Sequence, residues 1–210
     1  KLKTVFLNSA KECFPDIETV VYNMKPPRPE TWRHDLPHSS LKVSKEVLKE
    51  DVLTAVCDID LMFLNDISEI QKKNFDIAVT IRNWKHPLNS GVWFYNPGKK
   101  SKLFVETWIK NKLKIMKNVD KNKKVIEKYA GINQASLQMT IDQLENKTKI
   151  LKLPCVIWNA TQSEWKSVTE KTKIVHIKSQ LRRYCLNLEK MKEEYAYLKP
   201  LVKKWKGYLK

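Results

Sequence analysis

Asp58 and Asp60 are the residues of this chain whose type and spacing most clearly suggest chemistry. They stand between two apolar runs, at residues 52–56 and 61–64. Carboxylates are rarely left inside so hydrophobic a stretch without a positive partner, and a divalent metal ion is the commonest such partner. On a β-strand, side chains two residues apart point to the same face, so both carboxylates could reach one ion. The pair predicts a metal site at the end of a strand; two solvated acids are the alternative.

The segments around this pair predict the elements that position it. An apolar run of this length, bounded by acids and Asn, is typical of a fully buried strand in a parallel or mixed sheet. In open α/β sheets, ligands bind beyond the carboxyl ends of such strands. Further strands are predicted at residues 4–7, 19–22, 76–81, 92–95, 150–156 and 173–177.

Helical segments alternate with these strands. A helix capped by Ser39 or Ser40 is expected to lead into the aspartate strand. Further helices are predicted at residues 67–73, 101–116 and 134–144 and from about residue 186 to the end. The alternation indicates an α/β domain.

The stretch from Lys25 to Ser40 is expected to be a long loop. It contains four prolines, Pro26, Pro27, Pro29 and Pro37. Long loops in compact domains are often functional, so this one is a candidate wall or lid of a binding site, with a rigid surface excursion as the alternative.

Composition indicates a single intracellular domain. The chain has 210 residues, 42% of them hydrophobic, and four cysteines far apart in sequence, which we interpret as reduced thiols. A run of ~18 apolar residues, which a membrane span would need, does not occur. Because residue 1 is Lys, we expect the chain to be a processed product or an excised part of a longer, multidomain polypeptide.

The net charge of +17 implies attraction to polyanions such as nucleic acid, anionic membranes or nucleotide diphosphates. Much of the excess is Lys in the predicted helices, including residues 110–128 and 199–210, where a solvated face is the plainer interpretation. Charge alone does not identify a partner.

Several ordered segments resemble one family. These are residues 52–67, Phe75-Asp76, residues 88–92, Asn133-Gln134 and residues 175–178. Together they resemble the nucleotide-sugar glycosyltransferases of the GT-A type, in particular family 8, the glycogenin and bacterial galactosyltransferase group. More loosely, the chain resembles the glycosyltransferase domain of chlorella-virus enzymes that glycosylate capsid protein. The resemblance runs from about Thr4 to Arg183.

The resemblance implies a fold and the parts of the chain that bind the nucleotide and the acceptor. The fold would be α/β of the GT-A (Rossmann-like) kind: a mixed, mainly parallel central sheet flanked by helices, with a helical segment at the carboxyl end. Residues 1–210 would form a single glycosyltransferase domain, with the nucleotide-binding part at about 1–96 and the acceptor part at about 97–210.

The resemblance also implies a metal centre for Mn²⁺ or Mg²⁺ that bridges the two phosphates of the donor. Asp60 would be a direct ligand, Asp58 a ligand or ribose contact, and His176 a further ligand. Hard oxygen ligands suit such ions. For His176 the alternative is a core histidine that only makes a hydrogen bond.

Basic residues follow this histidine. In the family, the basic donors after the histidine hold the diphosphate, which points to Lys178, Arg182 and Arg183. The chain departs from the family here, because the usual Gly and the Lys-Pro-Trp ending are absent. Lys42 is a weaker phosphate candidate.

The sugar pocket is implied by two further segments. Asn89, Ser90 and Gly91 match the Asn-Ala-Gly segment that lines it, although a tight turn before a strand would account for the same residues. Gln134 stands where the family has a Gln beside the anomeric carbon of the donor, and Asn133 replaces the usual Asp.

The nucleotide base is expected at the end of the first strand, near Asn8, Ser9 and Ala10.

The implied reaction transfers a hexosyl group from a uridine diphosphate sugar to an acceptor hydroxyl, with the metal as a Lewis acid for the departing diphosphate. UDP-glucose is the default donor, and a related hexose or deoxyhexose is equally compatible. Asp60 and Gln134 would act in catalysis, with retention of anomeric configuration. The acceptor would be a glycan or a glycoprotein, a capsid protein included. The enzyme would be soluble in the cytoplasm, the host cytoplasm for a viral protein.

Two alternatives come from other classes. A phosphatase of the haloacid dehalogenase type also ends an apolar strand in Asp-x-Asp, with Thr80 as its second motif. It needs a later acidic pair, where this chain has Asn159 and His176. The other alternative is a non-enzymatic nucleic-acid binder that uses the basic surface, but the chain carries no recognised nucleic-acid motif.

Overall fold

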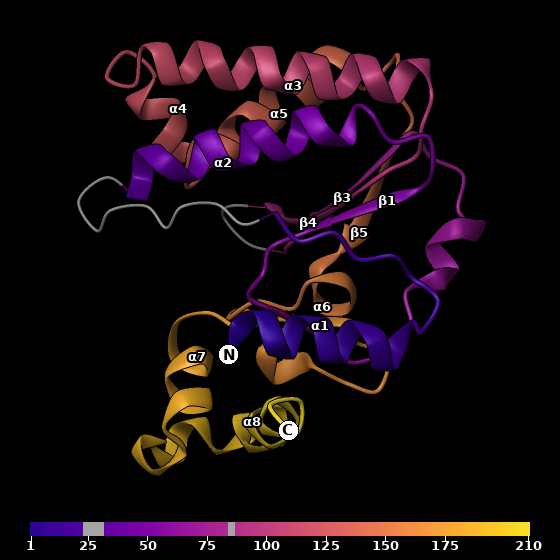
Figure 1. Ribbon diagram of the computed structural model, residues 1–210. Coiled ribbons are helices and arrows are strands. Elements are labelled where there is room, and N and C mark those ends of the chain that lie inside the picture. Colours follow the sequence, from indigo (N-terminus) through magenta and orange to yellow (C-terminus); the bar gives the residue numbers. More distant parts are fainter. Residues whose placement is uncertain (23–31, 84–86) are drawn as a thin grey trace. The chain divides into compact units, whose positions relative to one another are not determined.

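The computed structural model describes residues 1–22, 32–83 and 87–210 (Figure 1). The chain forms two compact units. Unit 1 comprises Lys1–Thr19, Cys57–Lys73 and Leu153–Lys210, and unit 2 comprises Val20–Val56 and Asn74–Lys152. Each unit is thus assembled from segments that are distant in sequence. The division into nucleotide-binding and acceptor parts at about residue 96 stays a prediction.

Unit 2 is built on a mixed sheet in the strand order β1-β4-β3-β5, with β1 Thr54–Cys57, β4 Leu88–Tyr95, β3 Ile77–Ile81 and β5 Ile150–Pro154. β3 and β4 are antiparallel, with Ile77 opposite Tyr95. The carbonyl of Lys149 accepts hydrogen bonds from the amides of Asp76 and Ile77, so β3 and β5 begin side by side and run parallel. The expected α/β class is confirmed.

Helices cover this sheet in unit 2: α2 Trp32–Val47, α3 Lys99–Lys117, α4 Lys123–Lys128 and α5 Ile132–Leu144. α2, α3 and α5 gather on one side of the strands (Figure 1). Phe104, Val105 and Trp108 of α3 are fully or almost fully buried at helical spacing. Trp108 meets Trp93 of β4 edge to face, with ring centroids 5.3 Å apart, and so joins the helical layer to the sheet.

Unit 1 contains a two-stranded antiparallel sheet of β2 Leu61–Phe63 and β6 Ile174–His176. Its α-helices are α1 Leu2–Cys13, α6 Cys155–Trp158, α7 Ser179–Leu186 and α8 Lys199–Gly207. Short 3₁₀ helices complete it: η1 Ser68–Lys72, η2 Trp165–Ser167, η3 Leu188–Lys190 and η4 Glu193–Leu198.

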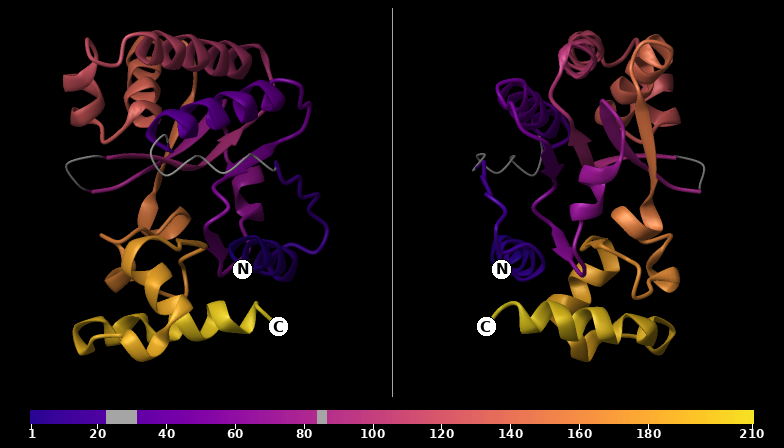
Figure 2. Two further views of the ribbon diagram at one scale, coloured as in Figure 1. Left: turned by 60° about the vertical axis from the view of Figure 1, so that its left-hand side comes forward. Right: turned by 90° about the vertical axis from the view of Figure 1, so that its right-hand side faces the viewer.

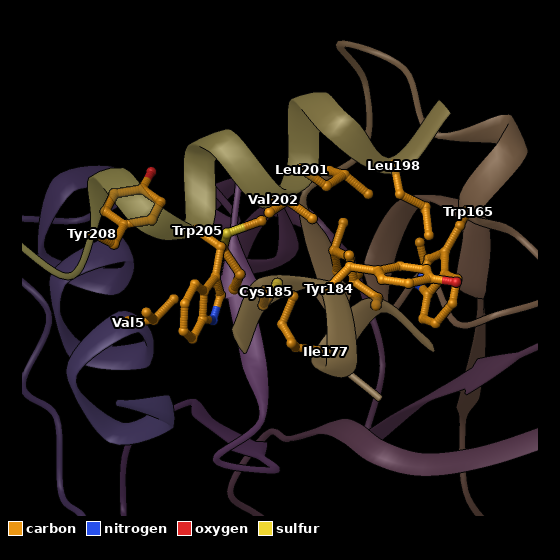
Figure 3. Packing of buried hydrophobic residues seen from close by; sticks show 14 residues of the cluster. Val5, Trp165, Ile177, Tyr184, Cys185, Leu198, Leu201, Val202, Trp205 and Tyr208 are labelled. Atoms are coloured by element: carbon orange, nitrogen blue, oxygen red, sulfur yellow. The ribbon is translucent and has the colours of Figure 1, made fainter. Parts of the chain in front are cut away.

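The core of unit 1 joins the two ends of the chain. Trp205 points from α8 toward Val5 of α1 and Cys185 of α7 (Figure 3). The Asn8 side chain donates to the carbonyl of Tyr208, and the Tyr208 hydroxyl donates to Glu12. Figure 2 shows α1 and α8 next to each other from two further sides. Because α8 buries large aromatic side chains, the expected helical end belongs to the core.

The predicted strand at residues 4–7 is wrong, since these residues lie in α1. Thr4, Val5 and Phe6 favour a strand by residue type. However, Val5, Phe6, Ser9 and Ala10 are buried together, which is the spacing of one face of a helix. Tertiary packing of that face against β2 overrides the local preference. Residues 19–22, the other strand predicted near the start, form no regular element.

The predicted loop of residues 25–40 falls partly outside the described residues. From Trp32 onward it is wrong, because α2 runs from Trp32 through Pro37 to Val47. A proline inside a helix removes only one backbone hydrogen bond, although it also strains the turn before it. The helix thus begins before Ser39 and Ser40, the caps that we expected.

Other predicted elements match the structure closely. The helices at 101–116 and 134–144 correspond to α3 and α5, the short helix at 67–73 is the 3₁₀ helix η1, and the strands at 76–81, 150–156 and 173–177 correspond to β3, β5 and β6. The four cysteines, all of them described, form no disulfide with one another. Among the described residues, no helix has the length and apolar character needed to cross a membrane.

Lys112 is the one lysine found fully buried among the residues whose exposure is described. Its Nζ donates to Ser40 Oγ at 2.6 Å and lies 4.7 Å from the ring centroid of Trp108. Burial lowers the pKa of Lys112 from 10.5 to about 7. Below pH 7 the folded chain therefore holds a poorly hydrated ammonium, which destabilises it. Between pH 7 and 10.5 the unfolded chain keeps a proton that the folded chain has released, so stability rises with pH.

We expect Lys112→Met to raise the free energy of unfolding by about 1–3 kcal/mol at pH 6 and by less at pH 9, because the buried charge that it removes is present mainly at the lower pH. Urea unfolding at both pH values measures the difference. Lys110→Met, on an exposed position of the same helix, is the matched control and should show no such gain. An equal gain for Lys112→Met at both pH values would contradict the lowered pKa.

Candidate metal centre

The two aspartates lie in the turn that joins β1 to β2. The expectation that both stand on one buried strand is wrong: β1 ends at Cys57, is only partly buried and forms an edge of its sheet. The alternation of a strand therefore does not bring the carboxylates together. The turn does, and it leaves Asp58 half open to solvent, with 55% of its side chain exposed.

His176 reaches the aspartates through backbone pairing in unit 1. The β2–β6 register sets Leu61 opposite His176. One step further along, the amide of Ile177 donates to the carbonyl of Asp60 at 2.7 Å. The residue before β2 is thereby held beside the end of β6, although 116 positions separate Asp60 from His176.

The three side chains converge. His176 Nε2 lies 2.9 Å from Asp60 Oδ1 and 3.6 Å from Asp58 Oδ2, and one ligand atom from each residue lies within 4.8 Å of the others. His176 is almost fully buried, whereas Asp60 is 18% and Asp58 55% exposed by side chain. The group is closed by protein on the histidine side and open on the Asp58 side.

These residues fit a divalent cation such as Mn²⁺ or Mg²⁺. Metal–oxygen bonds of roughly 2.1 Å place neighbouring ligands of an octahedral ion roughly 3 Å apart. The separations of 2.9 and 3.6 Å between His176 Nε2 and the two carboxylates are compatible with this. Two carboxylates and one imidazole also form a mixed hard and borderline donor set, which suits Mn²⁺ well.

Two further residues contact the candidate centre. The Nη2 of Arg182 donates to Asp60 Oδ2 in an ion pair, and its Nε donates to the carbonyl of Ile177 at 3.0 Å. Arg182 thus holds one oxygen of Asp60 and leaves the other facing His176. On the far side of the imidazole, Asn159 Oδ1 lies 3.0 Å from His176 Nδ1.

The sequence interpretation did not assign Asn159 to the site. The amide of Ala160 donates to the carbonyl of Ile174, and the amide of His176 donates to the carbonyl of Ala160, both at 2.9 Å. This short parallel bridge brings Asn159 to the histidine. The sequence could have indicated Asn159 as a site residue, because it is a polar residue directly after the apolar run 155–158, just as Asp58 follows an apolar run.

Electrostatics separate the two carboxyls. For Asp60, burial opposes ionisation, but the hydrogen bond and charge of His176 and the charges of Arg182 and Lys178 outweigh it and keep its pKa below the ordinary value. Asp58 differs: crowding by protein atoms and then the charge of Asp60 raise its pKa to about 7, although half of its side chain meets solvent. Burial lowers the pKa of His176, against the opposing effect of Asp60.

A cation would be attracted to this arrangement for two reasons. It would relieve the repulsion between the carboxyls of Asp58 and Asp60, and the lowered pKa of His176 favours the neutral imidazole that a metal ligand must be.

Ser179 stands in the stretch where the family's usual glycine is missing. Its φ of 43° lies in the left-handed region, which glycine adopts readily and other residues adopt at a cost. The residue starts α7, directly after Lys178. The chain therefore makes the turn after β6 without a glycine, in a strained conformation.

The predicted base contacts lie in unit 1 on α1, where no strand end exists. Ser9 is fully buried: its hydroxyl donates to the carbonyl of Phe6 and accepts from the amide of Phe63. Ala10 is buried, and Asn8 is bonded to Tyr208. The assignment of Asn8, Ser9 and Ala10 to the base stays a prediction, without the strand on which it was founded.

The remaining predicted residues belong to unit 2. Lys42 is exposed on α2. Asn89, Ser90 and Gly91 do not form a turn before a strand, because they lie inside β4 at an irregularity where the pairing shifts between Val79 and Thr80. There Asn89 Oδ1 accepts from the amide of Gly91 at 2.9 Å.

Gln134 lies in the first turn of α5, half-buried, and its Oε1 is close to Gly131. Gly131 has a φ of 134°. The neighbouring Asn133 has a buried Oδ1 that finds no hydrogen-bond partner within the part of the chain that the structure describes.

Fold and site together define an α/β protein with a candidate divalent-metal centre. In fold, the chain is similar to the crystal structure of a glycosyltransferase involved in the glycosylation of the major capsid of PBCV-1. The match has a TM-score of 0.53 at 8% sequence identity and covers 90% of this chain and 91% of that one. No protein-family model matches the chain, and no curated protein matches it in sequence. The likeness shows the fold.

We expect Ser179→Gly to raise the free energy of unfolding by up to about 1 kcal/mol, because glycine adopts this φ without strain. The gain is limited because glycine makes the unfolded chain more flexible and so increases the entropy lost on folding. Chemical unfolding measures the change. Ser179→Ala is the matched control, since alanine keeps the strain and should give no gain. A Gly variant less stable than the Ala variant would show that the φ of residue 179 is not strained.

Proposed function

We propose that this protein is a metal-dependent glycosyltransferase that moves a hexosyl group from a uridine diphosphate sugar to an acceptor hydroxyl. The observation that carries the proposal is the convergence of Asp58, Asp60 and His176 at the end of β6, in a chain whose fold is similar to that of a solved glycosyltransferase. UDP-glucose is the default donor, and a related hexose or deoxyhexose fits equally well.

Asp60 and His176 would hold Mn²⁺ or Mg²⁺, with Asp58 as a third ligand or as a contact to the ribose. The ion, when bound, would act as a Lewis acid on the departing diphosphate. Asp60 suits the role of a direct metal ligand, because its lowered pKa keeps the carboxylate ionised at neutral pH. Asp58 is the more exposed carboxylate, so it lies on the side from which a donor can approach.

Arg182 and Lys178 would hold the diphosphate. The guanidinium of Arg182 is anchored by Asp60 and by the carbonyl of Ile177, while 41% of the side chain is exposed. A guanidinium fixed in this way can still offer donors to a phosphate oxygen, and charge-assisted hydrogen bonds of this kind strengthen as the leaving group gains charge. The charge of Lys178 acts to lower the pKa of each aspartate, for Asp58 against the larger effects of burial and of Asp60, and this supports a role for Lys178 at the same centre.

The sugar and base contacts are proposed on resemblance. Asn89, Ser90 and Gly91 would line the sugar pocket. The hydrogen bond that the amide of Gly91 donates to Asn89 Oδ1 lies where the strand pairing is irregular. Gln134 would stand beside the anomeric carbon. Asn8, Ser9 and Ala10 for the base, and Lys42 for a phosphate, complete the proposed set.

A glycan or a glycoprotein would be the acceptor. The solved neighbour takes part in the glycosylation of a viral capsid, which makes a capsid protein a candidate acceptor for this chain as well. Action in the cytoplasm, the host cytoplasm for a viral enzyme, belongs to the same proposal, as does membership of a longer polypeptide.

A phosphatase of the haloacid dehalogenase type is less favoured. Its first aspartate must be ionised to act as a nucleophile, yet here Asp58 is the acid whose pKa is raised. The later positions that should supply acids hold Asn159 and His176, which are bonded to each other.

We expect a uridine diphosphate sugar to raise Tm in the presence of Mn²⁺, by about 5 °C or more at a hundredfold excess over its Kd, because the donor and ion bind only the folded chain. A thermal-shift screen of nucleotide sugars, with and without Mn²⁺, measures this. Asp60→Asn should abolish the shift, whereas Asp16→Asn, an exposed aspartate of unit 1, should retain it. A screen in which no nucleotide sugar stabilises the wild type would refute the proposal.

We also expect the transferred sugar to keep its anomeric configuration, because the leaving phosphate assists attack from the same face. Proton NMR of the first-formed product reports the configuration through the coupling constant of the anomeric proton. The inverted anomer as the first product would exclude retention and leave glycosyl transfer itself standing.

A further inference from the structure

Asn159 and His176 form a buried side-chain pair next to the candidate metal centre. Asn159 has no exposed surface, and His176 is 1% exposed. Asn159 Oδ1 lies 3.0 Å from His176 Nδ1, while the other ring nitrogen, Nε2, faces Asp60 and Asp58. The two nitrogens of one imidazole thus meet an amide oxygen on one side and two carboxylates on the other.

A neutral imidazole carries its proton on only one of these nitrogens, and the hydrogen bond made by one nitrogen decides the state of the other. The amide oxygen of Asn159 can only accept, so it draws the proton to Nδ1. Nε2 then presents a lone pair toward Asp60 Oδ1 and Asp58 Oδ2. A lone pair beside two carboxylate oxygens needs a positive charge between them, which is either a metal ion or a second proton on Nε2 that is donated to Asp60.

The pair is not required to hold this part of the backbone together. Two backbone hydrogen bonds already hold the segment against β6: the amide of Ala160 donates to the carbonyl of Ile174, and the amide of His176 donates to the carbonyl of Ala160, both at 2.9 Å. The amide of Asn159 itself donates to the carbonyl of Cys155 at 2.9 Å, which fixes the residue at the end of α6. The contact between the Asn159 side chain and the imidazole is therefore additional to the hydrogen bonds that hold the backbone here.

We propose that Asn159 is a positioning residue that keeps the proton of His176 on Nδ1 and so presents Nε2 as a metal ligand. The inference rests on the proposed metal-dependent function. Hydrogen-bond partners of metal-binding histidines commonly fix the tautomer in this way, and their loss typically costs 10–100-fold in metal affinity. In the opposite orientation of the amide, Nδ2 would donate to the ring, the proton would move to Nε2, and a bond from Nε2 to Asp60 would take the place of a cation.

The experiment uses the full chain with two substitutions at one position. Asn159→Leu removes the acceptor at similar volume, and Asn159→Asp keeps an acceptor oxygen. Long-range ¹H–¹⁵N NMR of the imidazoles, without metal, identifies the protonated nitrogen of His176, with His176→Gln for assignment. Electron paramagnetic resonance of free Mn²⁺ gives the Kd. Asn111→Leu, which removes a buried asparagine of unit 2, controls for general loss of stability.

We expect the wild type and Asn159→Asp to carry the proton on Nδ1 and to bind Mn²⁺ with Kd values within about tenfold of each other. Asn159→Leu should lose the preference for Nδ1 and raise the Kd by about 10–100-fold, while Asn111→Leu should leave it unchanged. If Asn159→Leu does not fold, as judged by circular dichroism, the wild type and Asn159→Asp decide the matter by their tautomers.

Two outcomes would be read differently. A proton on Nε2 with none on Nδ1 in the wild type, or an unchanged Kd in a folded Asn159→Leu, would overturn the role of Asn159 whatever the reaction. A wild type with its proton on Nδ1 that binds no Mn²⁺ would overturn the proposed metal-dependent function instead.

Discussion

The candidate site depends on one backbone interaction, the antiparallel pairing of β2 with β6. This ladder continues through the hydrogen bond from the amide of Ile177 to the carbonyl of Asp60, and it joins two parts of the chain that each carry residues of the site. The parallel bridge at Ala160 adds a third part on the other side of β6. Because a slip of one residue would turn His176 to the opposite face, the register of three short segments determines whether a metal centre exists.

The candidate centre gathers two negative side chains in a protein that is strongly basic as a whole. With a net charge of +17, the protein has an excess of cations, yet two carboxylates are placed together beside a buried imidazole. Arg182 neutralises part of Asp60 without covering Asp58. The result is a small acidic point within basic surroundings, an arrangement that attracts a metal ion and a polyanionic ligand at the same time, as a nucleotide diphosphate would require.

Prediction from sequence succeeded where one strong local signal was present and failed where the tertiary structure reversed it. The apolar periodicity of α3 and the short apolar runs of β3 and β6 were sufficient to place those elements. Residues 4–7 have the composition of a strand, yet they are helical because one face of α1 packs against the core. Pro37 indicated a loop, but α2 accommodates it. In both places, packing of the whole element outweighs the preference of single residues, which for Pro37 is a strong one.

The chemistry of the candidate site follows from residue types, which do not change on folding: two aspartates after an apolar run and a histidine within another are the donor types of a divalent-metal centre. The geometry of the site depends on how distant segments pair and pack. The tertiary structure set the aspartates in a turn rather than along a strand, paired Arg182 with Asp60, and brought Asn159 to the far side of His176. These contacts join residues distant in sequence, and their register comes from backbone pairing, which no local pattern of side chains specifies.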